Sequence, residues 1–220
     1  MKKILLVFIL AATYLAGYSQ SKILITTSDP DAVIKVDENA VGQGSYTLVL
    51  NWQKKCAHVT VEKLGYITSS HTFCTTEHPP KTYSFLLVKD ESYDASSQSQ
   101  NANNDISIVV KKNLTETDAW KLIGQIVTDK FDVIEVSDKE TGYMRTSWVV
   151  QSFNTNTIRT RLIVKLGDTD PLTYKIKVES EYSGASGTSV NADEKFKEWD
   201  RVLRKYDDIF SEFQTRLGGT

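Results

Sequence analysis

The sequence predicts a small all-β sandwich followed by an α+β domain, in a chain of 220 residues. Three observations carry this prediction. Residues 23–88 hold short alternating apolar runs and no helical period. Residues 92–105 are almost entirely polar. The remaining C-terminal residues combine a helix-like segment, four strand-like runs and a long apolar stripe with helical spacing.

The N-terminus predicts a signal peptide at residues 1–19. Two lysines precede an apolar run at 4–12, and the exit Gly17-Tyr18-Ser19 is small at its first and third positions, which places the cut before Gln20. A retained anchor helix is disfavoured because a span needs about 20 apolar residues. Tyr18 stands where a lipoprotein would carry its lipidated cysteine. We therefore expect an exported chain, periplasmic or extracellular, that is soluble and has no membrane span once mature.

The charge balance excludes two classes of partner. Loss of Lys2 and Lys3 with the signal peptide changes the formal charge from −2 to −4. A chain of this charge has no basic footprint for nucleic acid and no polybasic patch for anionic lipid.

The first domain is expected at residues 20–91. Its cysteines, Cys56 and Cys74, flank a hairpin that turns at Gly65, and folding about that glycine places them directly opposite each other. This arrangement favours a disulfide, which suits an exported protein with a small core. Free thiols remain an alternative. A metal site with His58 is disfavoured, because the alternation of side chains along a strand directs His71 to the other face.

The first domain resembles the PEGA-type β-sandwich repeat of bacterial envelope proteins. The resemblance rests on the segments at 28–32, 36–39, Gly42 and 59–66, which give Pro-x-Ala, a strand, a turn and a closing Gly-Tyr. Glu38-Asn39 departs from the glycine usual at that turn. The resemblance implies a binding or spacer module without chemistry of its own.

Residues 92–105 predict a flexible linker, since a polar segment of low complexity cannot offset its ordering entropy. The second domain is then expected at 106–220. Thr115 begins a helix with a capping-box-like start, and apolar residues from Ala119 to Val127 share one face. Strand-like runs come next, at 131–137, 143–151, 159–166 and 172–182.

The C-terminal segment predicts one long helix. Asn191 and Glu194 form a cap, and apolar residues recur at steps of three and four from Ala192 to Leu217. This stripe must cover an antiparallel sheet, which is the only large surface that the domain offers.

The second domain resembles the helix-grip arrangement of BamC-like envelope lipoproteins. Ala119-Trp120, the run from Val133 to Asp138, Gly142 to Thr146 and Arg159-Thr160-Arg161 carry the resemblance. It implies no catalytic residue, and the missing lipid cysteine departs from the family.

The sequence shows no catalytic, phosphate-binding or redox motif, so we predict a non-enzyme without metal or cofactor. Six aromatic residues are expected to meet between the sheet and the long helix, either as an ordinary core or as an apolar cavity. They are Trp148, Phe196, Trp199, Tyr206, Phe210 and Phe213.

Function is predicted from this architecture. The leading hypothesis is a cell-envelope binding or scaffolding protein of a Gram-negative-type bacterium, whose partner is an envelope protein or a glycan. The alternative is a soluble periplasmic carrier of a lipid or another apolar small molecule.

Overall fold

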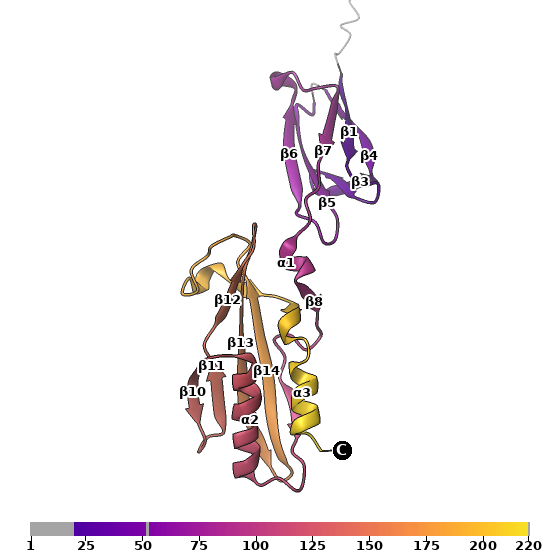
Figure 1. The fold of residues 1–220 in the computed structure, drawn as a ribbon. Helices are drawn as coiled ribbons and strands as arrows, with labels where there is room; N and C mark the ends of the chain where they lie inside the picture. Colours follow the sequence, from indigo (N-terminus) through magenta and orange to yellow (C-terminus); the bar gives the residue numbers. More distant parts are fainter. Residues whose placement is uncertain (1–19, 52, 220) are drawn as a thin grey trace, which may run out of the picture. The chain divides into compact units, whose positions relative to one another are not determined.

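The computed structural model describes residues 20–51 and 53–219, so the predicted signal peptide lies outside the described residues. The fold is mostly β, with several antiparallel sheets. The chain divides into two compact units whose boundary falls between Val88 and Lys89 (Figure 1). Each unit has its own hydrophobic core.

The first unit consists of two sheets that share one core. The three-stranded sheet has the order β4-β1-β7, and the four-stranded sheet has the order β3-β2-β5-β6. Their strands are β1 (Ser21–Thr27), β2 (Val33–Val36), β3 (Asn39–Gln43), β4 (Ser45–Leu50), β5 (Cys56–Glu62), β6 (Ser69–Cys74) and β7 (Thr82–Phe85). Alternation of apolar and polar residues along β1 and β5 directs Ile23, Ile25, Val59 and Val61 inward, where all four are fully buried.

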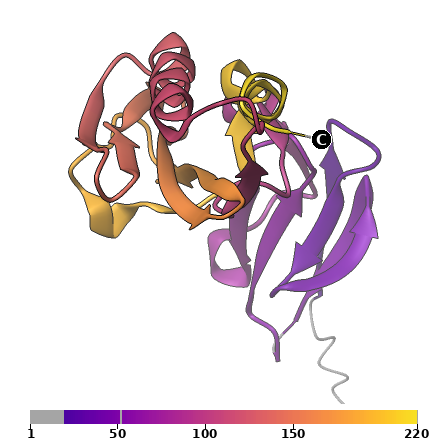
Figure 2. The same ribbon diagram turned by 90° about the horizontal axis from the view of Figure 1, so that it is seen from below.

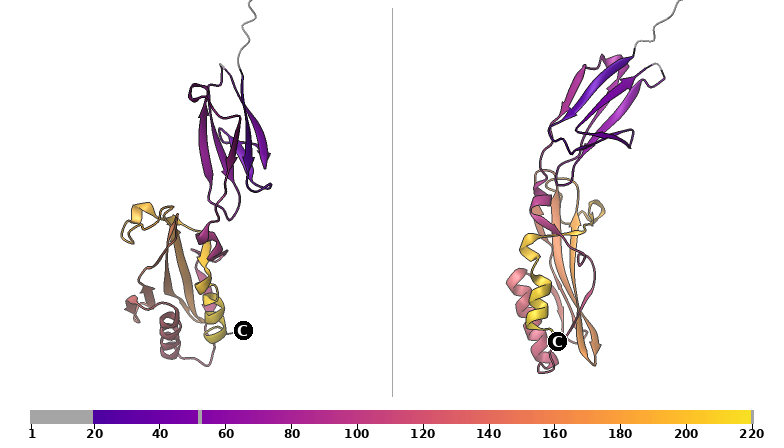
Figure 3. Two further views of the ribbon diagram at one scale, coloured as in Figure 1. Left: turned by 45° about the horizontal axis from the view of Figure 1, so that its top comes forward. Right: turned by 90° about the vertical axis from the view of Figure 1, so that its right-hand side faces the viewer.

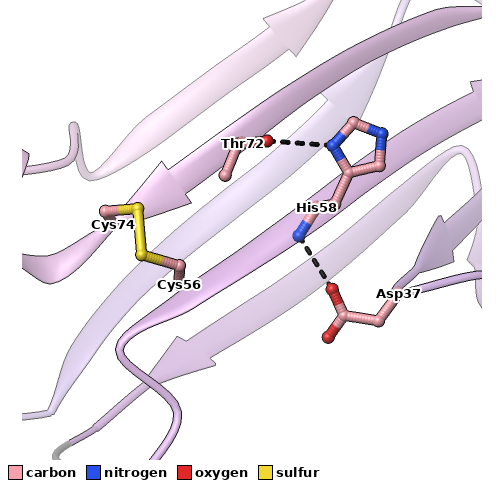
Figure 4. Close-up of a disulfide and its surroundings, with 5 residues drawn as sticks. All are labelled: Asp37, Cys56, His58, Thr72 and Cys74. Atoms are coloured by element: carbon pink, nitrogen blue, oxygen red, sulfur yellow. Dashed lines mark hydrogen bonds between the residues drawn. A yellow bond between two sulfur atoms is a disulfide. The ribbon is translucent and has the colours of Figure 1, made fainter.

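The predicted disulfide is confirmed. Antiparallel β5 and β6 place Cys56 directly opposite Cys74, and the two sulfur atoms are bonded across the strands (Figure 4). Gly65 lies in the turn between the two strands with a φ of 81°. That left-handed conformation carries little steric cost in glycine, so the turn fixes the register that pairs the cysteines.

The second unit is built on a seven-stranded antiparallel sheet. Its main path runs β10-β11-β13-β14-β15, while β12 pairs with β13 and β9 pairs with β14. The strands are β9 (Ile106–Val109), β10 (Ile134–Asp138), β11 (Tyr143–Thr146), β12 (Val149–Ser152), β13 (Thr157–Thr169), β14 (Leu172–Tyr182) and β15 (Lys197–Glu198). The predicted run at 143–151 is thus two strands, interrupted at Ser147-Trp148.

Helices α2 (Glu116–Lys130) and α3 (Ile209–Arg216) cover one face of this sheet, as Figures 2 and 3 both show. The predicted start of α2 is confirmed, because Thr115 Oγ1 accepts a hydrogen bond from the Asp118 amide at 3.1 Å. The side chains of Ile123 and Ile126 are fully buried against the sheet. The opposite face of the sheet carries Arg159, Arg161 and their neighbours, which alternate with core residues along β13.

The predicted long C-terminal helix is wrong. Residues 192–217 form the 3₁₀ turns η2 (Asp193–Lys195) and η3 (Arg204–Tyr206), strand β15, strand β16 (Arg201–Leu203) and α3, which has 8 residues. The apolar stripe fits a helix, but tertiary pairing overrides it. Strand β15 adds to β14, and β16 pairs with β8 (Ser96–Gln98), so that Val202 and Leu203 reach the core as strand residues.

The predicted flexible linker at 92–105 is also wrong. The segment belongs to the second unit and contains strand β8, which comes after helix α1 (Glu91–Asp94). Ser92 and Ser96 are buried despite their polarity because their hydroxyls are hydrogen-bonded. The hydroxyl of Ser96 donates to the Ser92 carbonyl at 2.8 Å and accepts from Arg201 Nε at 2.8 Å. Hydrogen bonds with a residue 105 positions away supply the order that composition does not predict.

Within the residues that the structure describes, no helix has the length and apolarity needed to cross a membrane.

Candidate functional site

The six predicted aromatic residues do not line a common cavity. Tyr206 and Phe213 are buried in the core of the second unit, where the Tyr206 ring stacks on Phe131 with centroids 4.6 Å apart. Trp199 and Phe210 pack against that core and are partly buried. Trp148 and Phe196 lie outside both cores and contact Arg159 instead. The structure therefore separates the set into core residues and residues on the outer face of the sheet.

Arg159 stacks between two aromatic rings. Its guanidinium carbon lies 4.3 Å from the Trp148 ring centroid and 4.1 Å from that of Phe196, while Arg161 lies 4.1 Å from the Trp148 centroid. Phe196, Arg159, Trp148 and Arg161, hereafter the arginine–aromatic ladder, thus alternate ring and cation. Because desolvated cation–π contacts are worth about 2 kcal/mol, the ladder stabilises this face of the sheet.

The ladder fixes the loop between β14 and β15. The side chain of Arg159 is only 4% exposed, and its charge is paired with Glu181 and Asp193. Its Nη1 also donates to the Val190 carbonyl at 2.7 Å. A buried cation that is paired and hydrogen-bonded in this way favours one loop conformation. Since the loop leads directly into β15, Arg159 helps to define where the residues after β15 lie.

Arg161 makes a second cross-strand pair, with Glu179. Its Nε lies 2.5 Å from Glu179 Oε2, and Lys177 Nζ lies 3.0 Å from the other carboxylate oxygen. Burial alone would raise the pKa of Glu179, but hydrogen bonds from Lys177 and Arg161 outweigh it and hold that pKa below its ordinary value. Glu179 therefore remains ionised and links the two cations.

A surface pocket of about 310 Å³ opens beside β15, at the residues just after that strand. We call it the Trp199 pocket. Its walls come from two segments distant in sequence, residues 102–104 and 198–200. The lining residues are Ala102, Asn103, Asn104, Glu198, Trp199 and Asp200.

The Trp199 pocket is held by main-chain hydrogen bonds and by the side-chain amide of Asn103. The Trp199 amide donates to the Ser180 carbonyl at 2.8 Å, and the Trp199 carbonyl accepts from Asn103 Nδ2 at 2.8 Å. Asn103 Oδ1 in turn accepts from the Ser180 amide at 2.9 Å, while the Ser99 amide donates to the Asp200 carbonyl at 3.1 Å. Both walls are thereby fixed to β14, so the pocket is formed before any ligand binds.

Asn103 supplies this fixation because it adopts a left-handed conformation, with a φ of 60°. Asparagine tolerates that region better than most residues, and its amide can hydrogen-bond main-chain groups on two sides. The run Asn101-Ala102-Asn103-Asn104-Asp105 is rich in turn-forming residues. That signal predicts a turn, but it does not reveal that the turn faces Trp199.

The described residues contain no group of three or more histidine, cysteine or acidic side chains placed to hold a metal ion. Cys56 and Cys74 are bonded to each other. His58 Nδ1 lies 2.9 Å from Thr72 Oγ1 on the exposed side of the hairpin, near the disulfide (Figure 4).

No family model matches the chain, and no curated protein matches it either.

Proposed function

We propose that this chain is a non-catalytic, exported binding or scaffolding protein of the cell envelope of a Gram-negative-type bacterium. The observation that carries the proposal is the Trp199 pocket, a preformed surface recess lined by Trp199, Ala102 and four polar residues. The disulfide supports an extracytoplasmic location, since such bonds persist in oxidising compartments.

The same proposal includes the finer fold of each unit. Two sheets around one core support a PEGA-type sandwich for residues 20–88. Two helices on one face of an antiparallel sheet support a helix-grip relationship for residues 89–219, although α3 is far shorter than the helix typical of that arrangement. The first resemblance implies a binding or spacer module, and the second implies no catalytic residue.

The packing between the helices and the sheet does not favour the carrier of apolar molecules. A carrier needs an apolar void between helices and sheet, yet side chains occupy the centre of that interface. Phe131 and Tyr206 stack there, and Phe213 and Ile126 are fully buried beside them in the same core.

Cosedimentation with isolated envelopes tests the proposal. Residues 20–220 are mixed with the insoluble envelope fraction of the producing organism and centrifuged, and we expect them to enter the pellet. Trp199→Ala should remain in the supernatant, while Leu64→Ala, which changes an exposed apolar residue of the first unit, should sediment like the wild type. Equal sedimentation of the wild type and Trp199→Ala would contradict the proposal.

A further inference from the structure

We propose that the Trp199 pocket binds a neutral sugar ring, so that the partner of this protein is an uncharged glycan. This inference rests on the proposed binding function and adds the chemical class of the ligand. It derives from the residue types that line the pocket, from their fixed positions and from the absence of basic side chains among them.

Trp199 is partly exposed and is the aromatic residue of the lining, and an indole ring suits the apolar face of a sugar. The C–H groups on one face of a pyranose carry partial positive charge, and the face of an indole ring carries partial negative charge. Trp199 is anchored through its backbone at both the amide and the carbonyl, and its side chain is partly buried against the core. A ring held in this way loses little conformational entropy when a ligand stacks on it.

The polar rim suits sugar hydroxyls. Glu198 and Asp200 flank Trp199 in sequence and are exposed, and an ionised carboxylate only accepts hydrogen bonds. Asn104 donates from Nδ2 to the Gln100 carbonyl at 2.8 Å, which keeps its amide oxygen as a further acceptor. Hydroxyl groups donate readily to such acceptors, and hydrogen bonds to an ionised oxygen are the stronger kind.

Charge decides between ligand classes. Two carboxylates and no lysine or arginine line the pocket, so a phosphate, a sulfate or a uronic acid would be repelled. A metal ion is disfavoured by the finding that no group of three suitable side chains occurs in the described part of the chain. A ligand with many hydroxyls and no negative charge can stack on the ring of Trp199 and donate hydrogen bonds to the two carboxylates.

The experiment titrates residues 20–220 with three neutral trisaccharides, cellotriose, maltotriose and triacetylchitotriose, and measures binding by calorimetry. We expect saturable binding of at least one. Trp199→Ala should weaken it about tenfold or more, which corresponds to about 1.4 kcal/mol, while Trp199→Phe should keep most of it because a stacking face remains. If none of the three binds at millimolar concentration, the inference is overturned.

A second pair of variants tests the rim and does not alter the core. Glu198→Gln combined with Asp200→Asn should weaken binding about tenfold. Glu194→Gln, an exposed carboxylate in the same segment but outside the pocket, should leave it unchanged. Wild-type affinity in the double variant, or tighter binding of trigalacturonate than of the neutral trisaccharides, would overturn the assignment.

Envelope cosedimentation separates this inference from the proposed function. If Trp199→Ala abolishes sedimentation but no trisaccharide binds, the function stands and the glycan inference fails. If neither depends on Trp199, both fail. Thermal unfolding of the double variant should match the wild type, and Trp199→Ala should keep a cooperative unfolding transition well above the temperature of the binding assay, which shows that lost binding is not lost folding.

Discussion

Arg159 illustrates at the residue scale how one side chain stabilises a surface feature. Removing one partner of a buried ion pair costs about 3 to 5 kcal/mol, because the remaining charge is left without compensation. Asp193 is largely exposed and can be rehydrated. The lost stability therefore comes mainly from Glu181, which is left without its cation, and from the two rings, which lose the guanidinium stacked between them. Arg159→Met should therefore lower the free energy of unfolding by about 3 kcal/mol in a urea titration.

The matched control is Arg216→Met. Arg216 also has two acidic partners, Asp129 and Glu212, but all three side chains are more exposed than that of Arg159. Exposed pairs contribute about 1 kcal/mol or less. Equal losses for the two variants would show that the ladder contributes nothing specific.

Tyr206 should make stability depend on pH in the alkaline range. Burial, with a smaller effect from the Asp132 carboxylate, raises the pKa of Tyr206 to about 12. In the unfolded chain its pKa is about 10, so between these values the unfolded state loses a proton that the folded state keeps. Stability contributed by the neutral phenol is present below pH 10 and falls by about 1.4 kcal/mol per unit above it.

Tyr206→Phe checks this dependence. Urea titrations at pH 9 and pH 11 should show a smaller alkaline loss in the variant than in the wild type. The two proteins would lose the same stability over this range if Tyr206 titrated normally in the folded state.

Site residues can be predicted from the sequence only where local geometry determines them. The cysteine pair is predicted by strand pairing about Gly65, and the hairpin register confirms it. Periodicity predicts Trp199 as an interior residue of a long helix. The structure instead places it just after β15, where Asn103 contacts its carbonyl. Residues nearly a hundred positions apart make this contact, and neither periodicity nor composition predicts it.

At the scale of elements, the stability of the second unit depends on tight turns that require glycine. Gly142 ends the turn between β10 and β11 with a φ of 65°, and a Cβ added there would collide with Leu166. Gly142→Ala should therefore destabilise the unit by more than the roughly 1 kcal/mol that a left-handed alanine costs by itself.

Gly184→Ala is the control for Gly142→Ala. Gly184 has a similar φ of 70°, but no atom lies within 4 Å of the added Cβ. Thermal unfolding should separate the two variants clearly. Similar melting temperatures would mean that Leu166 moves away at little cost.

The segment at 92–105 should resist proteolysis. Its backbone pairs with β16 through β8, and Ala102 and Asn103 are joined to β14, so cleavage requires local unfolding. Brief chymotrypsin digestion and mass spectrometry of the fragments should find no early cut after Tyr93. Rapid cleavage there would instead support the flexible linker that composition predicts.

Elements with strong local signals can be predicted from the sequence, and elements that depend on distant partners cannot. The capped helix α2 and the long hairpin β13–β14 are predicted by periodicity and turn residues. Strands β8, β15 and β16 are only two or three residues long. Strand β15 forms because it pairs with β14, and strands β8 and β16 form because they pair with each other. Short strands of this kind carry no period that a sequence window detects.

The whole molecule is two units with separate cores, and we assign ligand binding to the second. All residues of the Trp199 pocket and of the arginine–aromatic ladder lie after Lys89. The first unit contributes the disulfide and contributes no residue to the pocket.

Amide chemical-shift mapping with a glycan ligand tests this assignment, because it shows which residues the ligand contacts. ¹⁵N-labelled residues 20–220 are titrated with soluble glycan released from the envelopes of the producing organism. We expect the largest shifts at residues 99–104 and 198–200, and we expect the amides of residues 20–88 to remain unchanged. Shifts confined to the first unit, or none at any residue, would contradict the assignment of binding to the Trp199 pocket.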